Sequence, residues 1–296
     1  MRRLNTLTFR KAAMRSIAIL AVLASALVVG GADCFGAIIL HVDTGDSVDR
    51  RATGISSVLT ADGHEVTSIT DQAAAFAALN DPSLGNYDLV IWDKWHVEEG
   101  PGPDPDSDPG PVSQAVASLT NFVQMGGKLL VIGFDSALDS PPVFYSLLGG
   151  TGASDAGEGD DLNAVVNESN SLTRGLVDIR GLTPVGVSSS PSSYKDLDAL
   201  DGLAENTTAI VTSASGNHWT LRQLGLGEVA FISTPRGFNF ADDDPVYRDA
   251  LRNFAYSANF VADPPPTTPE PATLAIWAGL SAVGLIAARR KQKATA

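Results

Sequence analysis

The chain contains almost no cysteine and, between its two ends, little positive charge. Cys34 is the only cysteine in 296 residues, so the chain can form no internal disulfide. Of the 20 basic residues, five precede residue 37 and four follow residue 268, whereas 32 of the 34 acidic residues lie between those limits. The middle of the chain therefore has a formal charge of −21, which disfavours nucleic acid and anionic lipid surfaces as partners. Divalent cations, cationic polymers and neutral glycans stay open as partners, and solubility alone also accounts for the charge.

The first 36 residues have the three parts of a secretory signal peptide. Five cations precede an apolar segment, 17–29, and small residues follow it. We expect cleavage between Ala32 and Ala37, which would leave the rest of the chain outside the cytoplasm. Lipid attachment at Cys34 is disfavoured, because Asp33 precedes it where lipoprotein processing requires a small residue.

A second targeting pattern closes the chain. Pro269-Glu270-Pro271 ends a Pro-rich linker, 261–271, and precedes an uncharged apolar run, 272–288. A basic tail, 289–296, follows. The apolar run is at the short end of what can cross a bilayer as a helix, and the cations after it should stay cytoplasmic. A plain C-terminal membrane anchor is one interpretation of this pattern.

The order of the three parts resembles the PEP-CTERM sorting signal of Gram-negative bacteria. The resemblance implies that the C-terminal helix spans the membrane at first, that an exosortase-type processing enzyme removes it, and that the protein reaches the cell surface or extracellular matrix. The residues that carry this resemblance are Pro269, Glu270, Pro271, Arg289 and Arg290.

Residues 37–260 are predicted to form one exported α/β domain. Continuous apolar runs that end in polar residues are typical of buried parallel strands. Alternation of such runs with helical segments predicts a doubly wound, mostly parallel sheet with helices on both faces. Asp71 and Ser113 are expected to be N-caps, and 150–200 is expected to hold loops and short strands. The expected strands are 37–43, 65–69, 87–93, 128–134, 208–212, 218–224 and 227–233, and the expected helices are 50–61, 71–79, 113–125 and 245–256.

This order of elements resembles the class I glutamine amidotransferase-like fold, a flavodoxin-like architecture, including its trehalose-utilisation-like branch. The stretches that carry the resemblance are 87–93, the helix-Gly-Gly-strand unit ending at Phe134, 172–176, and the strand at 227–235 with the helix that ends in 253–255. The resemblance implies the fold but does not by itself imply an activity.

The two catalytic positions of the amidotransferases are not kept. Their nucleophilic cysteine follows Gly-x at the turn after the central strand, where this chain reads Gly133-Phe134-Asp135. Their His-Pro-Glu after the last strand corresponds to Thr234-Pro235-Arg236. Ser136 also lies one place too late for a Gly-x-Ser-x-Gly elbow. Glutaminase, thiol protease and serine esterase activities are therefore disfavoured, and a non-enzymatic role is favoured.

Several polar residues are expected at the carboxyl edge of the sheet, where doubly wound folds bind their ligands. Asp43, Asp93, His96 and Asp135 each follow a predicted strand and could bind a cation or activate water. The same residues could instead end the strands and cap helices. The other three histidines are isolated in the sequence, and we expect structural roles for them.

An acidic loop offers a second possible cation site. Asp104, Asp106 and Asp108 alternate with prolines, as the ligands of a calcium loop alternate with other residues. Pro109 and Ala115 stand where an EF-hand needs glycine and glutamate, so the loop is more simply a solvated acidic insertion. No cofactor other than Ca²⁺ is suggested.

Two functions agree with these patterns. The first is an exported, surface-sorted, non-catalytic protein associated with extracellular polysaccharide or matrix. The alternative is an exported carbohydrate-active hydrolase that uses the carboxylates at the strand ends.

Overall fold

The computed structural model describes residues 36–44, 52–94, 110–133, 137, 140–156, 161–185 and 197–259. They belong to a compact unit that ends at Asn259. The predicted signal peptide (apart from Gly36), acidic loop, linker and apolar tail lie outside the described residues. Within the described ranges, no helix has the length and apolar character needed to cross a membrane.

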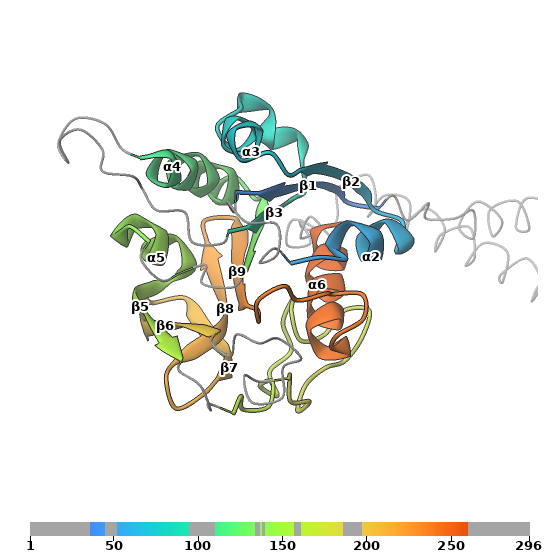
Figure 1. Cartoon of the computed structure of the whole chain (residues 1–296), viewed down its shortest axis with the longest axis vertical. Helices are drawn as coiled ribbons and strands as arrows, with labels where there is room; N and C mark the ends of the chain where they lie inside the picture. The colour runs from blue at the N-terminus through green and yellow to red at the C-terminus, as the bar shows by residue number, and fades with distance from the viewer. Residues whose placement is uncertain are drawn as a thin grey trace, which may run out of the picture. The chain divides into compact units, whose positions relative to one another are not determined.

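Nine strands of the described residues form one mixed sheet (Figure 1) in the order β2-β1-β3-β4-β9-β8-β6-β5, and β7 pairs with β8. The first five strands in this order are parallel, and all of them except the edge strand β2 are largely buried because helices cover both faces. These strands are β1 (Ile38–Asp43), β2 (Glu65–Ile69), β3 (Leu89–Asp93), β4 (Lys128–Gly133) and β9 (Gly227–Ser233).

The other part of the sheet is antiparallel, so the sheet is mixed and not mostly parallel as predicted. β8 (Asn217–Leu224) reverses the direction after β9, and β7 (Thr207–Thr212) and β6 (Leu197–Leu203) pair with it. β5 (Gly150–Ala156) completes this edge. The short connections from β7 to β8 and from β8 to β9 favour antiparallel pairing, whereas a parallel neighbour would need a crossover. β5 and β6 are separated by residues 157–196 and pair across this longer connection.

An aspartate caps the N-terminus of α3, of η2 and of α6, and one predicted cap needs correction. Asp71 accepts from Ala74 N at 2.9 Å, which confirms it as an N-cap. The predicted cap Ser113 is wrong, because its helix begins two residues earlier at Pro111, and proline is favoured in the first turn. α5 was not predicted. The helices are α2 (Ile55–Ala61), α3 (Gln72–Leu79), the 3₁₀ helix η2 (Pro82–Asn86), α4 (Pro111–Gln124), α5 (Pro142–Leu148) and α6 (Pro245–Ala258).

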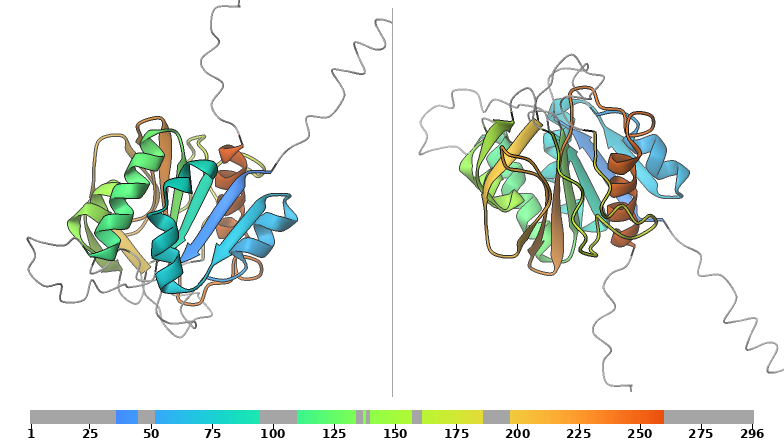
Figure 2. Two further views of the ribbon diagram at one scale, coloured as in Figure 1. Left: turned by 90° about the horizontal axis from the view of Figure 1, so that it is seen from above. Right: turned by 90° about the horizontal axis from the view of Figure 1, so that it is seen from below.

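Helices cover both faces of the sheet, as the two views of Figure 2 show. Alternate strand residues point to opposite faces, so Ile39 and Ile91 belong to one buried cluster and Leu40 and Val90 to the other. The first cluster includes side chains of α2 and α6, and the second includes side chains of α3, α4 and α5.

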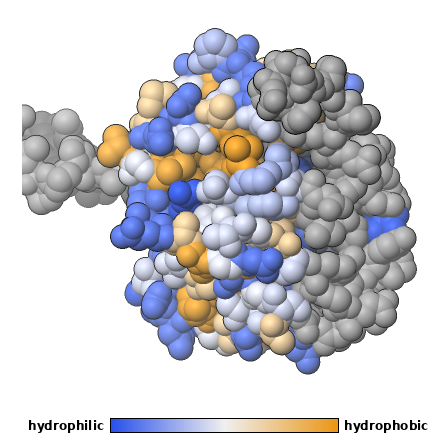
Figure 3. All heavy atoms as spheres, turned by 90° about the vertical axis from the view of Figure 1, so that its left-hand side faces the viewer, coloured by the Kyte–Doolittle hydropathy of each residue, from blue (hydrophilic) through white to orange (hydrophobic). Residues whose placement is uncertain are grey.

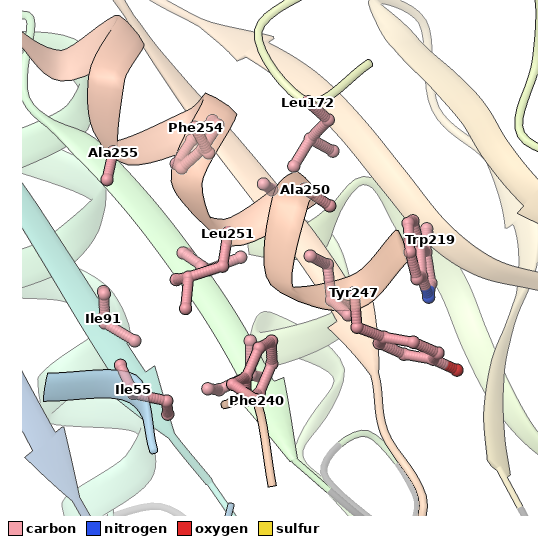
Figure 4. Packing of buried hydrophobic residues seen from close by; sticks show 14 of the residues in the cluster. Ile55, Ile91, Leu172, Trp219, Phe240, Tyr247, Ala250, Leu251, Phe254 and Ala255 are labelled. Atoms are coloured by element: carbon pink, nitrogen blue, oxygen red, sulfur yellow. The ribbon is translucent and has the colours of Figure 1, made fainter. Parts of the chain in front are cut away.

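α6 shows how the first cluster is built (Figure 4). Its apolar residues recur at helical spacing, so Tyr247, Leu251 and Phe254 face the sheet together. Tyr247 packs edge-on against Trp219 of β8, with ring centroids 4.7 Å apart. One helix therefore joins the parallel and antiparallel parts of the sheet through its buried face.

Candidate functional site

The carboxyl edge of the parallel strands brings together two of the predicted site residues. Asp43 ends β1 and Asp93 ends β3, and the two are direct neighbours in the strand register. Both are buried, with 3% and 1% of their surface exposed. His96 and Asp135, which the sequence places at the same edge, lie outside the described residues. Among the residues described, no group of three or more His, Cys, Asp or Glu side chains could hold a metal.

The carboxylate of Asp93 holds the chain together at this edge. Its Oδ2 accepts from the buried Ala52 N at 3.0 Å, just before α2 begins. Its main-chain oxygen accepts from Thr44 N at 3.1 Å, at the end of β1. A general acid or base has to reach its substrate, and a carboxylate that is buried and bonded in this way cannot do so without a rearrangement. Its geometry is that of a structural residue.

Lys94 is a buried cation at the same edge that the sequence patterns did not reveal. Its side chain is fully buried, donates from Nζ to Ser140 Oγ at 2.7 Å, and lies 4.7 Å from the ring centroid of Phe144. A buried ammonium is costly unless it is paired, so these partners are necessary. The sequence indicated only that Lys94 directly follows a buried strand, and a lysine in that position is usually exposed.

An aromatic and amide network surrounds this lysine. Trp92 Nε1 donates to Thr44 Oγ1 at 2.8 Å, and Gln72 Nε2 donates to Thr44 O at 2.9 Å. The Trp92 ring packs edge-on against Phe144, with centroids 5.6 Å apart. The ends of β1 and β3 are thereby tied to α3 and α5. The network orders the edge and leaves few of its described polar groups for a ligand.

The turn after β4 requires a glycine. Gly133 has a φ of 139°, and a Cβ there would lie 2.5 Å from the carbonyl oxygen of Lys94. On the neighbouring strand, Ser233 Oγ is buried and has no hydrogen-bond partner in the described part of the chain. Thr234 N donates to Gly133 O at 3.2 Å. The chain therefore passes Gly133 closely on both sides, at Lys94 after β3 and at Thr234 after β9, and a larger residue would not fit there.

A histidine and a serine form a second polar pair where β7 turns into β8. His218 Nδ1 lies 2.9 Å from the carbonyl oxygen of Asp198, which can only accept, so this nitrogen carries the proton. In the neutral ring Nε2 is then an acceptor, and it receives the hydroxyl of Ser213 at 2.8 Å. Ser213 Oγ also accepts from Ser215 N at 3.0 Å. These bonds close the hairpin, which is a structural role of the kind expected for His218.

The other two histidines are also bound within the fold. His64 Nδ1 accepts from Ala37 N at 2.9 Å, and burial lowers its pKa. His41 Nδ1 lies 3.1 Å from Ser56 Oγ, and burial lowers the pKa of His41 to about 4. Both rings are therefore neutral at pH 7, and neither lies with the carboxylates at the strand ends.

Comparisons with known proteins show similarity at the level of the fold only. No protein-family model and no curated protein matches the chain. A cytoplasmic protein of Salmonella typhimurium is 14% identical over 74% of this chain and 97% of its own, with a TM-score of 0.42. A ThuA-like protein of Parabacteroides merdae is 12% identical over 79% of this chain and 94% of its own, with a TM-score of 0.45. A glutamine amidotransferase of Thermotoga maritima is 10% identical over 66% of this chain and 74% of its own, with a TM-score of 0.40. Solved neighbours thus include ThuA-like and amidotransferase-like folds, and at these similarities they assign no activity.

Proposed function

We propose that the protein is exported, sorted to the cell surface by a PEP-CTERM-type tail, and associated there with extracellular polysaccharide or matrix without catalysing a reaction. The observation that carries this proposal is the order of Pro269-Glu270-Pro271, the apolar run 272–288 and the cations from Arg289 onward. A membrane span beside a cationic cytoplasmic end supplies what a processing enzyme in the membrane needs to hold its substrate.

Two properties of the domain support a role without catalysis. The described carboxylates at the strand ends are buried, and Asp93 is bonded to the main chain. The formal charge of −21 between residues 37 and 268 keeps an exported domain soluble and repels polyanions, and a largely neutral glycan is among the partners that this charge allows.

The sorting step is tested by the intact mass of the native protein from the membrane and extracellular fractions of its own cells. We expect an extracellular species trimmed near Pro269. Replacement of Pro269, Glu270 and Pro271 by alanine should leave the full-length chain in the membrane. The matched control replaces Pro264, Pro265 and Pro266, which lie in the same linker, and should be trimmed like the wild type. If the wild-type protein stayed untrimmed in the membrane, the tail would be a plain membrane anchor and the proposed sorting step would be wrong.

The absence of catalysis is tested separately. The purified protein is incubated with the polysaccharide of the same cells, and new reducing ends are measured. We expect none above those formed with heat-denatured protein. Turnover that is lost in Asp93→Asn or Asp135→Asn would replace this proposal with the hydrolase.

A further inference from the structure

A groove of about 530 Å³ lies between α4, α5 and the end of β8, away from the carboxylates at the strand ends. We call it the α4–α5 groove. A volume of this size is in the range of small-molecule sites. Figure 3 looks onto the side of the domain that carries α4 and α5, where polar and hydrophobic residues alternate over the surface.

The charge in the α4–α5 groove differs from that of the domain around it. Arg222 lines the groove, and no aspartate or glutamate among the described residues does, although the middle of the chain carries a formal charge of −21. Burial lowers the pKa of Arg222, but a guanidinium titrates so far above neutrality that it stays charged. The described lining of the groove therefore carries one positive charge and no negative charge, in contrast to the acidic composition of the domain.

The arginine is held in place and still has donors to offer. Its Nη1 donates to the carbonyl oxygens of Ser146, at a short distance, and Leu147, at 3.2 Å, near the end of α5. All its hydrogen bonds to described residues use this one nitrogen, so Nη2 has donors left for a ligand. A guanidinium anchored on one side loses little side-chain entropy when its other side binds a carboxylate.

The rest of the lining suits a sugar ring. Thr120 and Gln124 present hydroxyl and amide groups from α4, while Val143, which is 46% exposed, presents aliphatic surface from α5. Thr120 Oγ1 donates to Val116 O at 2.7 Å, so its lone pairs can accept from a ligand. Sugars combine hydroxyl groups at the ring edge with C–H groups on its faces, and this lining offers partners for both.

We propose that the α4–α5 groove binds a carboxylated sugar unit, such as a uronic acid, within an otherwise neutral glycan. This inference rests on the proposed association with extracellular polysaccharide and names the feature of the glycan that is recognised. The net charge of the domain repels a densely charged polymer, whereas an isolated carboxylate meets that field only within a Debye length of about 8 Å at physiological salt. Arg222 would then pair with the carboxylate through a charge-assisted hydrogen bond.

Calorimetric titration of the full-length protein with three probes tests which chemical groups of the ligand are recognised. Methyl β-glucuronide should bind about tenfold more tightly than methyl β-glucoside, which has a neutral hydroxymethyl group in place of the carboxylate. A tenfold difference corresponds to about one net charge-assisted hydrogen bond. Acetate should bind more weakly than the glucuronide, because it lacks the ring. If the two glycosides bound with equal affinity, the carboxylate would have no role in binding. If acetate bound as tightly as the glucuronide, the groove would not recognise the sugar ring.

The location is tested with Ala117→Trp, which fills the groove from an exposed position on α4 and leaves Arg222 and its bonds to α5 in place. We expect it to abolish glucuronide binding. The matched control is Gln114→Trp, which lies on the same helix outside the groove and should bind like the wild type. Binding by Ala117→Trp at wild-type affinity would overturn the inference.

Polysaccharide from the same cells separates this inference from the proposed function. If the wild type and Ala117→Trp retain this polysaccharide equally, the association stands and the groove is not its site. If the wild type binds glucuronide in the groove but does not retain the polysaccharide, the groove binds a carboxylated sugar but the proposed association with polysaccharide is wrong.

Discussion

The parallel and antiparallel parts of the sheet are stabilised in different ways. In β3 every residue is buried, and in β4 all but the first are buried, so these strands gain from apolar burial along their whole length. In β7 and β8 buried residues occupy only part of each strand, and the buried polar residues His218 and Thr220 lie among them. The antiparallel part therefore depends more on specific hydrogen bonds, which are costly when one partner is lost.

Truncating a leucine in each part should give the largest contrast. Leu130→Ala in β4 removes a fully buried side chain and should lower the free energy of unfolding by about 3 to 4 kcal/mol. Leu221→Ala in β8 removes a partly buried side chain and should cost about 1 to 2 kcal/mol. Urea unfolding at neutral pH measures both values. Equal losses would mean that β8 contributes as much apolar burial as β4.

A histidine in the parallel part should make the domain sensitive to acid. Burial lowers the pKa of His41 from its ordinary 6.5 to about 4, so the unfolded state binds the proton more readily. The stability that depends on the neutral ring is complete above pH 6.5 and is lost as the pH falls toward 4, by about 3 kcal/mol in all. Burial lowers the pKa of His64 as well, which adds to the loss in the same direction.

Unfolding free energies measured from pH 7 to pH 4 should fall less steeply in His41→Leu than in the wild type. Ser56 and Ser68, which contact the ring, lie within hydrogen-bond distance of each other and can stay paired in the variant. The same slope in both proteins would show that His41 does not carry the effect, and His64→Gln would then be the variant to compare.

The sequence predicted every strand of the parallel part. Continuous apolar runs such as 87–93 and 128–134 belong to strands buried on both faces, and β3 and β4 confirm both predictions to within two residues. In the antiparallel part, β7 and β8 confirm the strands predicted at 208–212 and 218–224 to within one residue. β5 contains Gly150 and Gly152 and has no apolar periodicity, and no element was predicted where α5 follows Pro141. β5 pairs with β6 across residues 157–196, and local propensity holds no information on such a distant pairing.

The candidate site was predictable to the same limited extent. Asp43 and Asp93 were placed together because both end parallel strands, and the register makes them neighbours. Their burial was not predictable, because it depends on how α2 and the other strands close over the edge. Lys94 was missed for a related reason, since its partners Ser140 and Phe144 lie about 50 residues away in the chain.

Asp93→Ala should show how strongly this carboxylate holds the parallel edge. The buried Ala52 N would lose its acceptor, and we expect a loss of about 2 kcal/mol in urea unfolding. Asp93→Asn keeps an acceptor oxygen and should lose less. If the two variants were equally destabilised, the charge of the carboxylate would matter more than the bond to Ala52.

The smallest effect is expected at the hairpin of the antiparallel part. Ser213→Ala removes the acceptor of Ser215 N and the partner of His218 Nε2, but Ser213 is itself partly exposed, so water can replace the lost bonds. We expect a loss of about 1 kcal/mol in urea unfolding. Ser213→Thr keeps the hydroxyl and is the matched control. A loss as large as that of Asp93→Ala would mean that the hairpin is closed as tightly as the parallel edge, and the contrast between the two parts would then rest on apolar burial alone.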